Sequence, residues 1–444
     1  MAGMLHKVGY LFGGYWEAAH AIRRQYHPQA IRATQDARLR HLVRYSFDHI
    51  KYYREAFQRA GVRPEQIESI DDLHRLPLLT KHELRNQFWD FLPRDLPACR
   101  VTRTSGSSGT PVCIFADWHS RRMNSAATIR FFRAVGMPVA GHAILTLLKT
   151  EQEGARASHW VVAQGLCRKY YLNPHVTSRA NREYAGALIA RLGRPSLTGI
   201  ASALRAFARG VRDGVFPSFT PARIISGGEL LLPEGRELIE STFQTRVLDI
   251  YACNETRTIA WQCGDGGYHI NADNVIVEIV RDGRPVPDGE MGEVVLTDLN
   301  RHVMPIIRYR NGDMARRMAG FCSCRCKLPL LAEIIGRTGE NVRLPDGRVV
   351  LWNLLKSHMT HPGIRQFQLV QVRDGALIVK YVPEPGSEVT QTDALLERRF
   401  RDLLGDAIPV RMEHVERIEP APSGKTSLVI SHYVPPAEQA ETCE

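Results

Sequence analysis

Apolar residues recur at helical spacing through much of the first 98 residues. The segment QDARLRHLVRYSFDHIKYYREAFQRAG places them three to four positions apart and ends in a glycine, as amphipathic helices commonly do. After a short connection, the segment TKHELRNQF predicts a capped helix that starts near Thr80. Residues 1–98 are therefore predicted to form a helical segment that packs on a larger domain.

The pattern changes at about residue 99, where short apolar runs begin to alternate with helical segments. The runs HAILTLL, ARIISGG and RVLDIYA have the length of buried strands, whereas NREYAGALIARLG and PEGRELIESTF have helical periodicity. This alternation is typical of an α/β sheet. We therefore expect an α/β protein whose main domain spans residues 99–337.

Strands predominate from residue 261 onwards. YHINADNVIVEIV, GEVVLTDL and MPIIRYRNGD predict strands separated by turns such as RDGRPVPDGE, so residues 261–337 are expected to form a β-rich subdomain. A strand pair turned at Asp374-Gly375 and a helix in DALLERRFRDLLG follow. Residues 338–444 are predicted to form a small α+β C-terminal domain.

Composition agrees with a folded chain of more than one domain. The 444 residues are 44% hydrophobic and 24% charged, and the formal net charge is +11. That charge favours anionic partners such as nucleotides or CoA. The arginines are scattered, however, which indicates a solvated basic surface, and no nucleic-acid-binding module is recognisable.

The sequence also bears on location and assembly. No stretch approaches the roughly 20 apolar residues that a membrane span needs, and the N-terminus lacks the apolar core of a secretory signal. We therefore expect a cytoplasmic protein. A homodimer is compatible with the sequence, which leaves the oligomeric state open.

The segment TSGSSGTPV, residues 104–112, combines hydroxyl side chains with glycines and a proline. Glycines allow backbone N–H groups to converge on a polyphosphate, and the hydroxyls add donors. No Gly-Lys-Ser/Thr sequence follows, so it is not a Walker A loop. By itself the segment is interpreted either as a phosphate loop or as a polar surface loop.

Four further segments could each supply part of an ATP site. SGGELL would let the backbone approach a flat ring, and IYACNE places Tyr251 for stacking and Glu255 for Mg²⁺. RYRNGDM is expected to end a strand in a turn that aims Asp313 outward, towards a ribose diol. PSGKTS places Lys425 on a glycine-flanked turn, where its charge could reach the α-phosphate. Each residue also has an ordinary alternative: core packing for Tyr251, turn formation for Asp313 and a solvated tail for Lys425.

The order of these segments resembles that of the adenylate-forming superfamily of acyl-CoA synthetases. MPIIRYRNGD, YHINADNVIVEIV, the Cys-x-Cys before LPLL and the segment GRTGENVRLPDGR are most similar to the branch of phenylacetate–CoA ligases and CapK-type capsule proteins. The resemblance covers roughly residues 75–430, and its most specific parts are the Gly/Ser/Thr segment and RYRNGD. It implies a nucleotide- and acyl-binding main domain and a mobile C-terminal domain.

The resemblance also implies roles for individual residues. The phosphate loop would run from Thr104 to Pro111 and includes Ser105, Gly106, Ser107, Ser108, Gly109 and Thr110. Gly227, Gly228 and Glu229 would form the adenine wall, with Tyr251 stacking nearby. Glu255 would be the Mg²⁺-associated glutamate, with Asn254 beside it.

Three more roles follow from the same resemblance. Asp313 would bind the ribose hydroxyls, Arg337 would lie at the hinge side of the nucleotide, and Lys425 would serve adenylation. The implied reaction has two steps: a carboxylate and ATP give an acyl adenylate and pyrophosphate, and a nucleophile then displaces AMP. The C-terminal domain would rotate between the steps.

Several positions depart from the family pattern. Asn254 stands where the family commonly has threonine or serine, and Gly339 stands where an acidic hinge residue is usual, which leaves Glu340 as a substitute. The sequence GKTSL lacks the arginine often found after the lysine. Residues 140–170 do not reproduce the glycine-aromatic segment of phenylacetate ligases, so we expect a different acyl pocket.

Nine cysteines are unevenly distributed, and four of them fall between Cys263 and Cys326. Cys263, His269, Cys322 and Cys324 could form a closed tetrahedral Zn²⁺ site of structural type. The segment around the Cys-x-Cys pair resembles that of metal-carrying members of the branch. Cys326 and Cys253 remain alternative ligands, and unmetallated thiols remain the alternative interpretation.

These observations leave three functional hypotheses. In the first, the chain is an ATP- and Mg²⁺-dependent ligase that activates a small carboxylic acid and transfers the acyl group to CoA. In the second, the acyl adenylate passes to an amine, as in an amide synthetase. In the third, the chain is a non-catalytic nucleotide-binding relative, although such a protein would need neither Glu255 nor Lys425. The sequence does not identify the acid.

Overall fold

The computed structural model describes residues 2–103, 112–138, 140–148, 159–161, 166–337, 342–346, 348–350, 355, 358–359, 361, 363–405, 408–419 and 428–433. The chain divides into two compact units. The first comprises Met1–Asn311 and Ala315–Ile334, and the second comprises Gly312–Met314 and Ile335–Glu444. The fold is of the mixed α/β class that the alternation of strands and helices predicts.

Helices occupy most of the N-terminal region. They are α1 (Ala2–Arg24), α2 (Pro28–His49), α3 (Lys51–Arg59) and α4 (Lys81–Asn86), with short 3₁₀ helices at Pro64–Gln66, Ile70–Arg75 and Phe88–Phe91. The predicted cap at Thr80 is confirmed, because its hydroxyl accepts a hydrogen bond from the Glu83 N–H and the Glu83 carboxylate accepts one from the Thr80 N–H. The long helix predicted to end near Gly61 is broken at Ile50, which adopts an extended conformation with its side chain fully buried.

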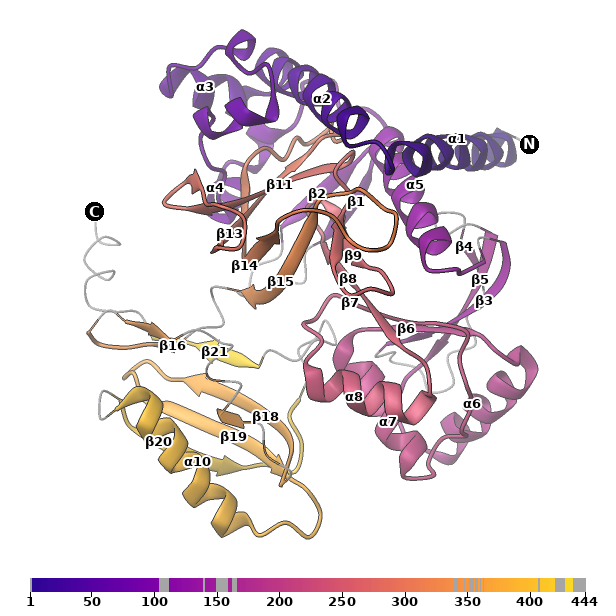
Figure 1. The fold of residues 1–444 in the computed structure, drawn as a ribbon, viewed down its shortest axis with the longest axis vertical. Coiled ribbons are helices and arrows are strands. Elements are labelled where there is room, and N and C mark those ends of the chain that lie inside the picture. The colour runs from indigo at the N-terminus through magenta and orange to yellow at the C-terminus, as the bar shows by residue number, and fades with distance from the viewer. Residues whose placement is uncertain are drawn as a thin grey trace. The chain divides into compact units, whose positions relative to one another are not determined.

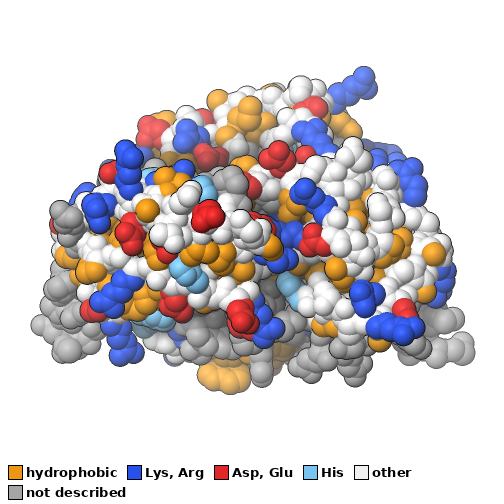
Figure 2. All heavy atoms as spheres, turned by 90° about the horizontal axis from the view of Figure 1, so that it is seen from below, with side chains coloured by type: hydrophobic (Ala, Val, Ile, Leu, Met, Phe, Trp, Pro, Cys, Tyr) orange, Lys and Arg blue, Asp and Glu red, His pale blue; other side chains and the backbone are white. Residues whose placement is uncertain are grey.

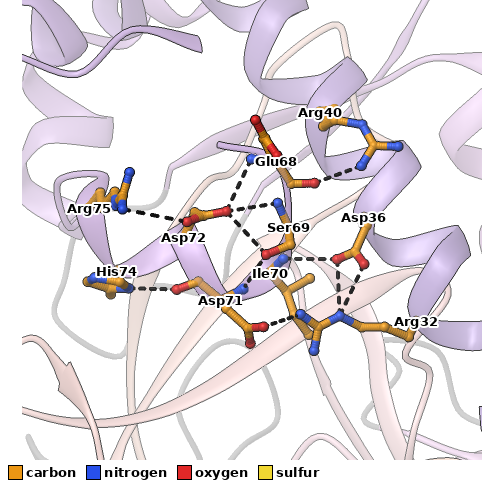
Figure 3. A network of polar contacts seen from close by, with 10 residues as sticks. All are labelled: Arg32, Asp36, Arg40, Glu68, Ser69, Ile70, Asp71, Asp72, His74 and Arg75. Atoms are coloured by element: carbon orange, nitrogen blue, oxygen red, sulfur yellow. Dashed lines mark hydrogen bonds and ion pairs between the residues drawn. The ribbon is translucent and has the colours of Figure 1, made fainter. Parts of the chain in front are cut away.

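A network of polar contacts fastens the segment after α3 to helix α2 (Figure 3). Asp36 accepts hydrogen bonds from Arg32 Nε, at 3.1 Å to Oδ2, and from the Ile70 N–H, at 2.9 Å to Oδ1. Arg32 also pairs with Asp71. Exposed ion pairs of this kind contribute less than about 1 kcal/mol each. The network therefore fixes the path of the chain more than it stabilises the fold.

One 13-stranded sheet runs through the first unit in the order β12-β11-β13-β14-β15-β10-β9-β8-β7-β6-β3-β5-β4. Its strands are β3 (Ala140–Leu147), β4 (His159–Val161), β5 (Leu166–Leu172), β6 (Ser196–Gly199), β7 (Ile224–Gly227), β8 (Val247–Cys253), β9 (Arg257–Gln262), β10 (Tyr268–Ile270), β11 (Val275–Arg281), β12 (Arg284–Pro285), β13 (Met291–Asp298), β14 (Tyr309–Met318) and β15 (Leu330–Arg337). Strands from the β-rich segment and from the preceding α/β segment thus belong to the same sheet.

Five neighbouring strands, β5, β3, β6, β7 and β8, are parallel. The helices of this region are α5 (Trp118–Ala134), α6 (Arg179–Leu192), α7 (Ala201–Arg212) and α8 (Pro233–Phe243). Helices α7 and α8 lie side by side over the sheet (Figure 1), and residues such as Leu204, Phe207 and Ile239 form the core between them. A separate antiparallel pair, β1 (Arg100–Arg103) and β2 (Cys113–Ala116), precedes α5.

The second unit is an α+β sandwich, as predicted for the C-terminal domain. Strands β18 (Ile364–Gln371), β19 (Leu377–Pro383), β20 (Val410–His414) and β21 (Val429–Ser431) form a sheet in the order β20-β19-β18-β21. Helix α10 (Val389–Leu404) packs against it, and β16 (Val342–Arg343) pairs with β17 (Val349–Val350). The predicted turn between β18 and β19 is confirmed, with Gly375 at φ +91°.

Candidate functional site

The candidate nucleotide site begins where two parallel strands end. Gly227 is the last residue of β7 and pairs with Ile250 of β8, so the GGE and IYACNE segments lie next to each other. Ligands of open α/β sheets bind outside the carboxyl ends of such strands. The GGE and IYACNE segments, which the sequence predicts to contact ATP, are therefore neighbours at the edge of the sheet where ligands commonly bind.

The two glycines are required by the local backbone. A Cβ atom at Gly227 would lie 3.2 Å from the Ile250 carbonyl oxygen, which is tighter than ordinary contact, and Gly228 has φ +85°. Glu229 follows, and its Oε2 accepts a hydrogen bond of 2.8 Å from the Ser202 N–H in the first turn of α7. Its carboxylate is therefore held at a helix N-terminus, where negative charge is favourable.

Glu255 lies in the turn between β8 and β9, next to Asn254. Its side chain is 8% exposed, and its Oε1 accepts a hydrogen bond of 3.0 Å from the hydroxyl of Tyr309 on β14. Within the part of the chain that the structure describes, Oε2 has no hydrogen bond. This leaves one carboxylate oxygen available for a cation, which fits the preference of Mg²⁺ for one or two protein carboxylates.

A second hydrogen bond connects the same two segments. The Asn311 amide donates to the Tyr251 hydroxyl at 2.7 Å. Tyr251 is 9% exposed and belongs to the hydrophobic core of the sheet, so its ring packs and its hydroxyl is held by the RYRNGD strand. Tyr309 and Asn311 lie inside a motif that the sequence singled out, but only the structure shows what their side chains contact.

The expected turn at Asp313 is wrong. Asp313 lies in the middle of β14, which continues to Met318, and Gly312 has φ +84° within the strand. An irregular glycine inside a strand is typical of a local bulge, which is why RNGD resembles a turn in the sequence. Residues Gly312–Met314 group with the second unit, so Asp313 and Glu255 belong to different units.

Other predicted positions lie outside the described residues. These are the phosphate-loop residues Thr104, Ser105, Gly106, Ser107, Ser108, Gly109 and Thr110, and the adenylation residue Lys425. Arg337 is the last residue of β15, and only its backbone is described. The ends of the Gly/Ser/Thr segment are described: Arg103 of β1 pairs with Cys113 of β2, so the segment connects two antiparallel strands.

Arg257 is a residue that sequence reasoning missed. It has φ +64°, which is unusual for a side chain of this size, and its Nη2 donates to the Thr102 hydroxyl at 3.2 Å. Burial and the neighbouring Arg301, Arg100 and Arg121 lower its pKa. Positively charged side chains therefore surround Thr102 of β1, which is two residues before the Gly/Ser/Thr segment. An arginine two positions after Glu255 was the available signal.

The predicted cysteine–histidine cluster is assembled in the structure. The ligand atoms of Cys263, His269, Cys322 and Cys324 all lie within 4.8 Å of one another. The Sγ atoms of Cys263 and Cys322 are 3.5 Å apart, and Cys324 Sγ is 3.2 Å from His269 Nε2. Cys263 lies in the β9–β10 turn, His269 lies on β10, and the other two cysteines lie in the β14–β15 connection.

The chemistry of this donor set fits a tetrahedral zinc ion. Burial and the nearby Arg130 lower the pKa of His269 to about 4, so the imidazole is neutral at pH 7 and its nitrogen can ligate. The two alternative cysteines are not part of this group: Cys326 is buried beside it in the same hydrophobic core as Cys263, and Cys253 Sγ is 3.3 Å from the Thr256 hydroxyl in the β8–β9 turn.

None of the described helices is long and apolar enough to cross a membrane.

Comparison with known proteins adds relatives that cover most of the chain. The CapK C-terminal domain family matches residues 345–432. Phenylacetate-coenzyme A ligase from Aromatoleum evansii is 24% identical over 425 residues, which cover 90% of this chain and 94% of the relative. Protein CapK from Staphylococcus aureus is 20% identical over 416 residues, which cover 90% of this chain and 88% of CapK.

Solved structures share the fold. The crystal structure of 2-hydroxyisobutyryl-CoA ligase in the postadenylation state superimposes with a TM-score of 0.70 and 18% identity, and the alignment covers 95% of this chain and 93% of the other. ATP-bound MatB from Rhodopseudomonas palustris superimposes with a TM-score of 0.54 and 16% identity, and the alignment covers 76% of this chain and 68% of MatB. Fold, motif order and relatives that cover most of the chain agree, and the chain is similar to the adenylate-forming ligases, most of all to the branch that contains phenylacetate–CoA ligases and CapK.

Proposed function

We propose that the protein is an AMP-forming ligase that activates a carboxylic acid with ATP and transfers the acyl group to CoA. In the first step, a carboxylate oxygen of the acid forms a bond to the α-phosphorus of ATP, and pyrophosphate leaves with the electrons of the broken phosphoanhydride bond. In the second step, the CoA sulfur attacks the acyl carbon, AMP leaves, and the thiol proton passes to solvent.

The observation that carries this proposal is the pair of hydrogen bonds between the β8–β9 segment and β14. Tyr309 holds Glu255, and Asn311 holds the Tyr251 hydroxyl. Two segments separated by more than fifty residues are thereby fixed to each other, with a buried carboxylate between them. Only Oε1 of this carboxylate is hydrogen-bonded within the described residues, which leaves Oε2 for a cation.

The individual residues would act as follows. Glu255 would hold Mg²⁺, which when bound neutralises charge on the phosphates of ATP. The segment from Thr104 to Thr110 would donate backbone and hydroxyl hydrogen bonds to those phosphates, and Gly227, Gly228 and Glu229 would contact the adenine. Asp313 would accept from the ribose hydroxyls, and Lys425 would stabilise charge that develops between the carboxylate and the α-phosphate.

Exchange of labelled pyrophosphate into ATP, screened over a panel of carboxylic acids, tests the first step. We expect Glu255→Gln to slow acid-dependent exchange by at least about 100-fold, since it weakens the site for the cation that the phosphates require. Glu237→Gln, which changes an exposed glutamate on α8, is the matched control and should exchange at the wild-type rate. Exchange that is unaffected by Glu255→Gln would refute the role given to Glu255.

The acceptor is tested by adding CoA or an amine once an acid has been found. Thioester formation is expected with CoA. The substituted hinge, with Gly339 in place of an acidic residue, keeps an amide synthetase as the second candidate. Release of AMP with an amine but not with CoA would establish that alternative and overturn the thioester proposal.

We also propose that the cysteine–histidine cluster holds a structural Zn²⁺. All four protein ligands of a tetrahedral ion are present, which leaves no open position for a substrate. The zinc would connect the β9–β10 turn to the β14–β15 connection and would stabilise this end of the sheet.

A further inference from the structure

The first unit contains a hollow of about 450 Å³ that is built from residues outside the candidate nucleotide site. It lies between helix α2, the first turn of α5 and the connection that follows β13. Small-molecule sites commonly have volumes from about 300 to 1,000 Å³. We call this hollow the histidine pocket, because His41, His119 and His302 line it together with Arg38 and Asn300.

Three separate elements bring the imidazoles together. Arg38 and His41 are three residues apart on one face of α2, His119 is the second residue of α5, and His302 follows β13. The ring centres of His302 and His41 are 5.1 Å apart, and those of His302 and His119 are 6.0 Å apart. Tyr45, one turn further along α2, places its ring 5.1 Å from that of His302.

One polar atom of this pocket lacks the partner that a buried group normally has. His302 Nε2 is shielded from solvent and has no hydrogen-bond partner among the residues that the structure describes. His41 and His119 are exposed, and within the described residues neither makes a hydrogen bond, so their ring nitrogens are open to a ligand. A buried polar atom without a partner costs about 1–3 kcal/mol, so His302 Nε2 needs an explanation.

Arg38 supplies the fixed positive charge. Its Nη1 donates to the Asp273 backbone oxygen at 2.6 Å, and within the described residues it forms no ion pair with a carboxylate. The Asp273 carboxylate is instead engaged by Arg130 and Arg24. Arg38 therefore interacts with the Asp273 carboxylate only at a distance, and its guanidinium beside three imidazoles makes a pocket that is suited to an anion.

The other charged groups near the histidines are accounted for. Asp117 faces His302, His119 and Tyr45, but its Oδ1 caps α5 by accepting from the Ser120 N–H at 2.8 Å. Glu17 and Arg122 both face His119 and pair with each other at 3.6 Å. Among the described residues that line the pocket, none carries a carboxylate.

We propose that the histidine pocket binds a small phosphate monoester. Donors approach from three directions, which matches the three outer oxygens of a phosphoryl group better than the two oxygens of a carboxylate. Ala37 and Leu299 supply apolar wall for the organic part of the ligand, which the volume of the pocket also requires. The site is independent of the proposed catalysis, and binding there is expected whether or not the chain forms an acyl adenylate.

The proposal determines how binding depends on pH. Burial and the neighbouring His41 and His119 lower the pKa of His302 to about 4, so the His302 imidazole is neutral near pH 7 in the empty pocket. A bound phosphate shares one proton with an imidazole. The second pKa of a phosphate monoester is about 6, so above that pH binding takes up a proton from solvent. Affinity should therefore fall as pH rises from 6 to 8, by about 10-fold or more.

The test is NMR spectroscopy of the full-length protein labelled with ¹³C at histidine Cε1, titrated with phenyl phosphate or inorganic phosphate. His119→Gln and His302→Gln identify their resonances by loss of the signal. We expect both resonances to shift on titration at pH 6.5, and we expect phenyl phosphate to bind at least 5-fold more tightly than inorganic phosphate. Benzoate at equal concentration serves as the carboxylate comparison.

Two arginine variants on the same helix provide the control. Arg38→Gln should weaken the titration at least 10-fold, whereas Arg40→Gln, which removes an exposed charge bonded to the Glu68 backbone, should leave it unchanged. The proposal would be overturned if the His119 and His302 resonances did not shift at up to about 10 mM of either phosphate, a concentration at which even millimolar binding is detected. Benzoate shifts as large as those with phenyl phosphate would assign the pocket to carboxylates instead.

Discussion

At the scale of single residues, the RYRNGD motif contains side chains with different tasks. The guanidinium of Arg308 is 2% exposed and bonds both oxygens of Glu278, at 3.1 and 3.0 Å. It also donates to the backbone oxygens of His74, Leu76 and Gly283. Arg308 therefore ties the segment before α4 to the sheet and has a structural role, whereas Tyr309, the next residue, reaches Glu255.

This difference predicts that Arg308→Met destabilises the fold. The substitution leaves Glu278 buried and without its partner, which should lower the free energy of unfolding of the first unit by about 3–5 kcal/mol. Arg310→Met, two residues along the strand, removes an exposed pair with Glu293 and should cost less than about 1 kcal/mol. Urea unfolding followed by tryptophan fluorescence measures both, and equal losses would contradict the structural role of Arg308.

Tyr309→Phe tests the neighbouring position. Loss of the hydroxyl removes one hydrogen bond to a carboxylate, an interaction of about 1.5–3 kcal/mol, so pyrophosphate exchange should fall by roughly 10- to 100-fold. The free energy of unfolding should fall by no more than about the same amount, because the ring continues to fill the core. Tyr26→Phe, at an exposed position on the connection after α1, is the control. An unchanged exchange rate in Tyr309→Phe would show that the orientation of Glu255 does not limit the reaction.

At the scale of elements, the turn between β10 and β11 is held by a buried charge cluster. Asp273 lies in this turn and accepts from Arg130 of α5 at 2.9 and 3.1 Å and from Arg24 of α1 at 3.3 Å. Burial alone would raise the pKa of Asp273, but Arg130, Arg24 and Arg38 lower it below its usual value. Two helices and the sheet therefore depend on one ionised carboxylate.

The lowered pKa fixes the sign of a pH effect. Because the pKa is lower in the folded state, Asp273 contributes its full stabilisation above the unfolded-state value of about 4 and loses it as pH falls through the folded-state value. The difference in urea midpoint between wild type and Asp273→Asn should therefore be largest near pH 6 and shrink towards pH 3. A difference that grows on acidification would contradict the ionised state of Asp273.

The cysteine cluster supports another prediction about elements. Purified protein should contain about one zinc per chain by elemental analysis, since one tetrahedral site has four ligands. Cys324→Ala should lose most of the metal and lower the thermal midpoint. Cys326→Ala, which changes a buried cysteine outside the cluster, should retain it. Equal zinc contents in the two variants would refute the ligand set.

At the scale of the whole molecule, the proposed catalytic groups are distributed over two units. Glu255 belongs to the first unit, whereas Asp313 and Lys425 belong to the second. This distribution agrees with a two-step reaction in which the smaller unit changes position. Charge is spread more evenly: Figure 2 shows Lys and Arg side chains scattered among acidic and apolar ones on the face that it displays, as the sequence predicts for a solvated basic surface.

Lys425→Ala separates binding from chemistry. Pyrophosphate exchange should fall by about 100-fold or more, because the lysine would stabilise charge that is present mainly in the transition state. ATP binding measured by calorimetry should change by less than about 3-fold. Wild-type exchange in Lys425→Ala would show that another group supplies that charge.

The sequence determined the elements and the local chemistry. Apolar patterns predicted the α/β order, and short local sequences predicted the Thr80 cap and the β18–β19 turn, because these signals depend on residues close together in the chain. The order of the motifs along the chain indicated the resemblance to the adenylate-forming ligases. It also selected the four cysteine-cluster ligands, which the structure brings together. The sequence misassigned RNGD as a turn, because a glycine within a strand and a glycine in a turn look alike without the neighbouring strand.

Only the tertiary structure decided which distant side chains meet. Tyr309 with Glu255, Arg308 with Glu278 and the three histidines of the pocket are contacts between residues 30 to more than 250 positions apart. Such contacts depend on how strands are ordered and how helices pack on them, and no local pattern records that order. The chain therefore specifies its motifs locally, whereas burial, pairing and the pocket arise only when the sheet is assembled.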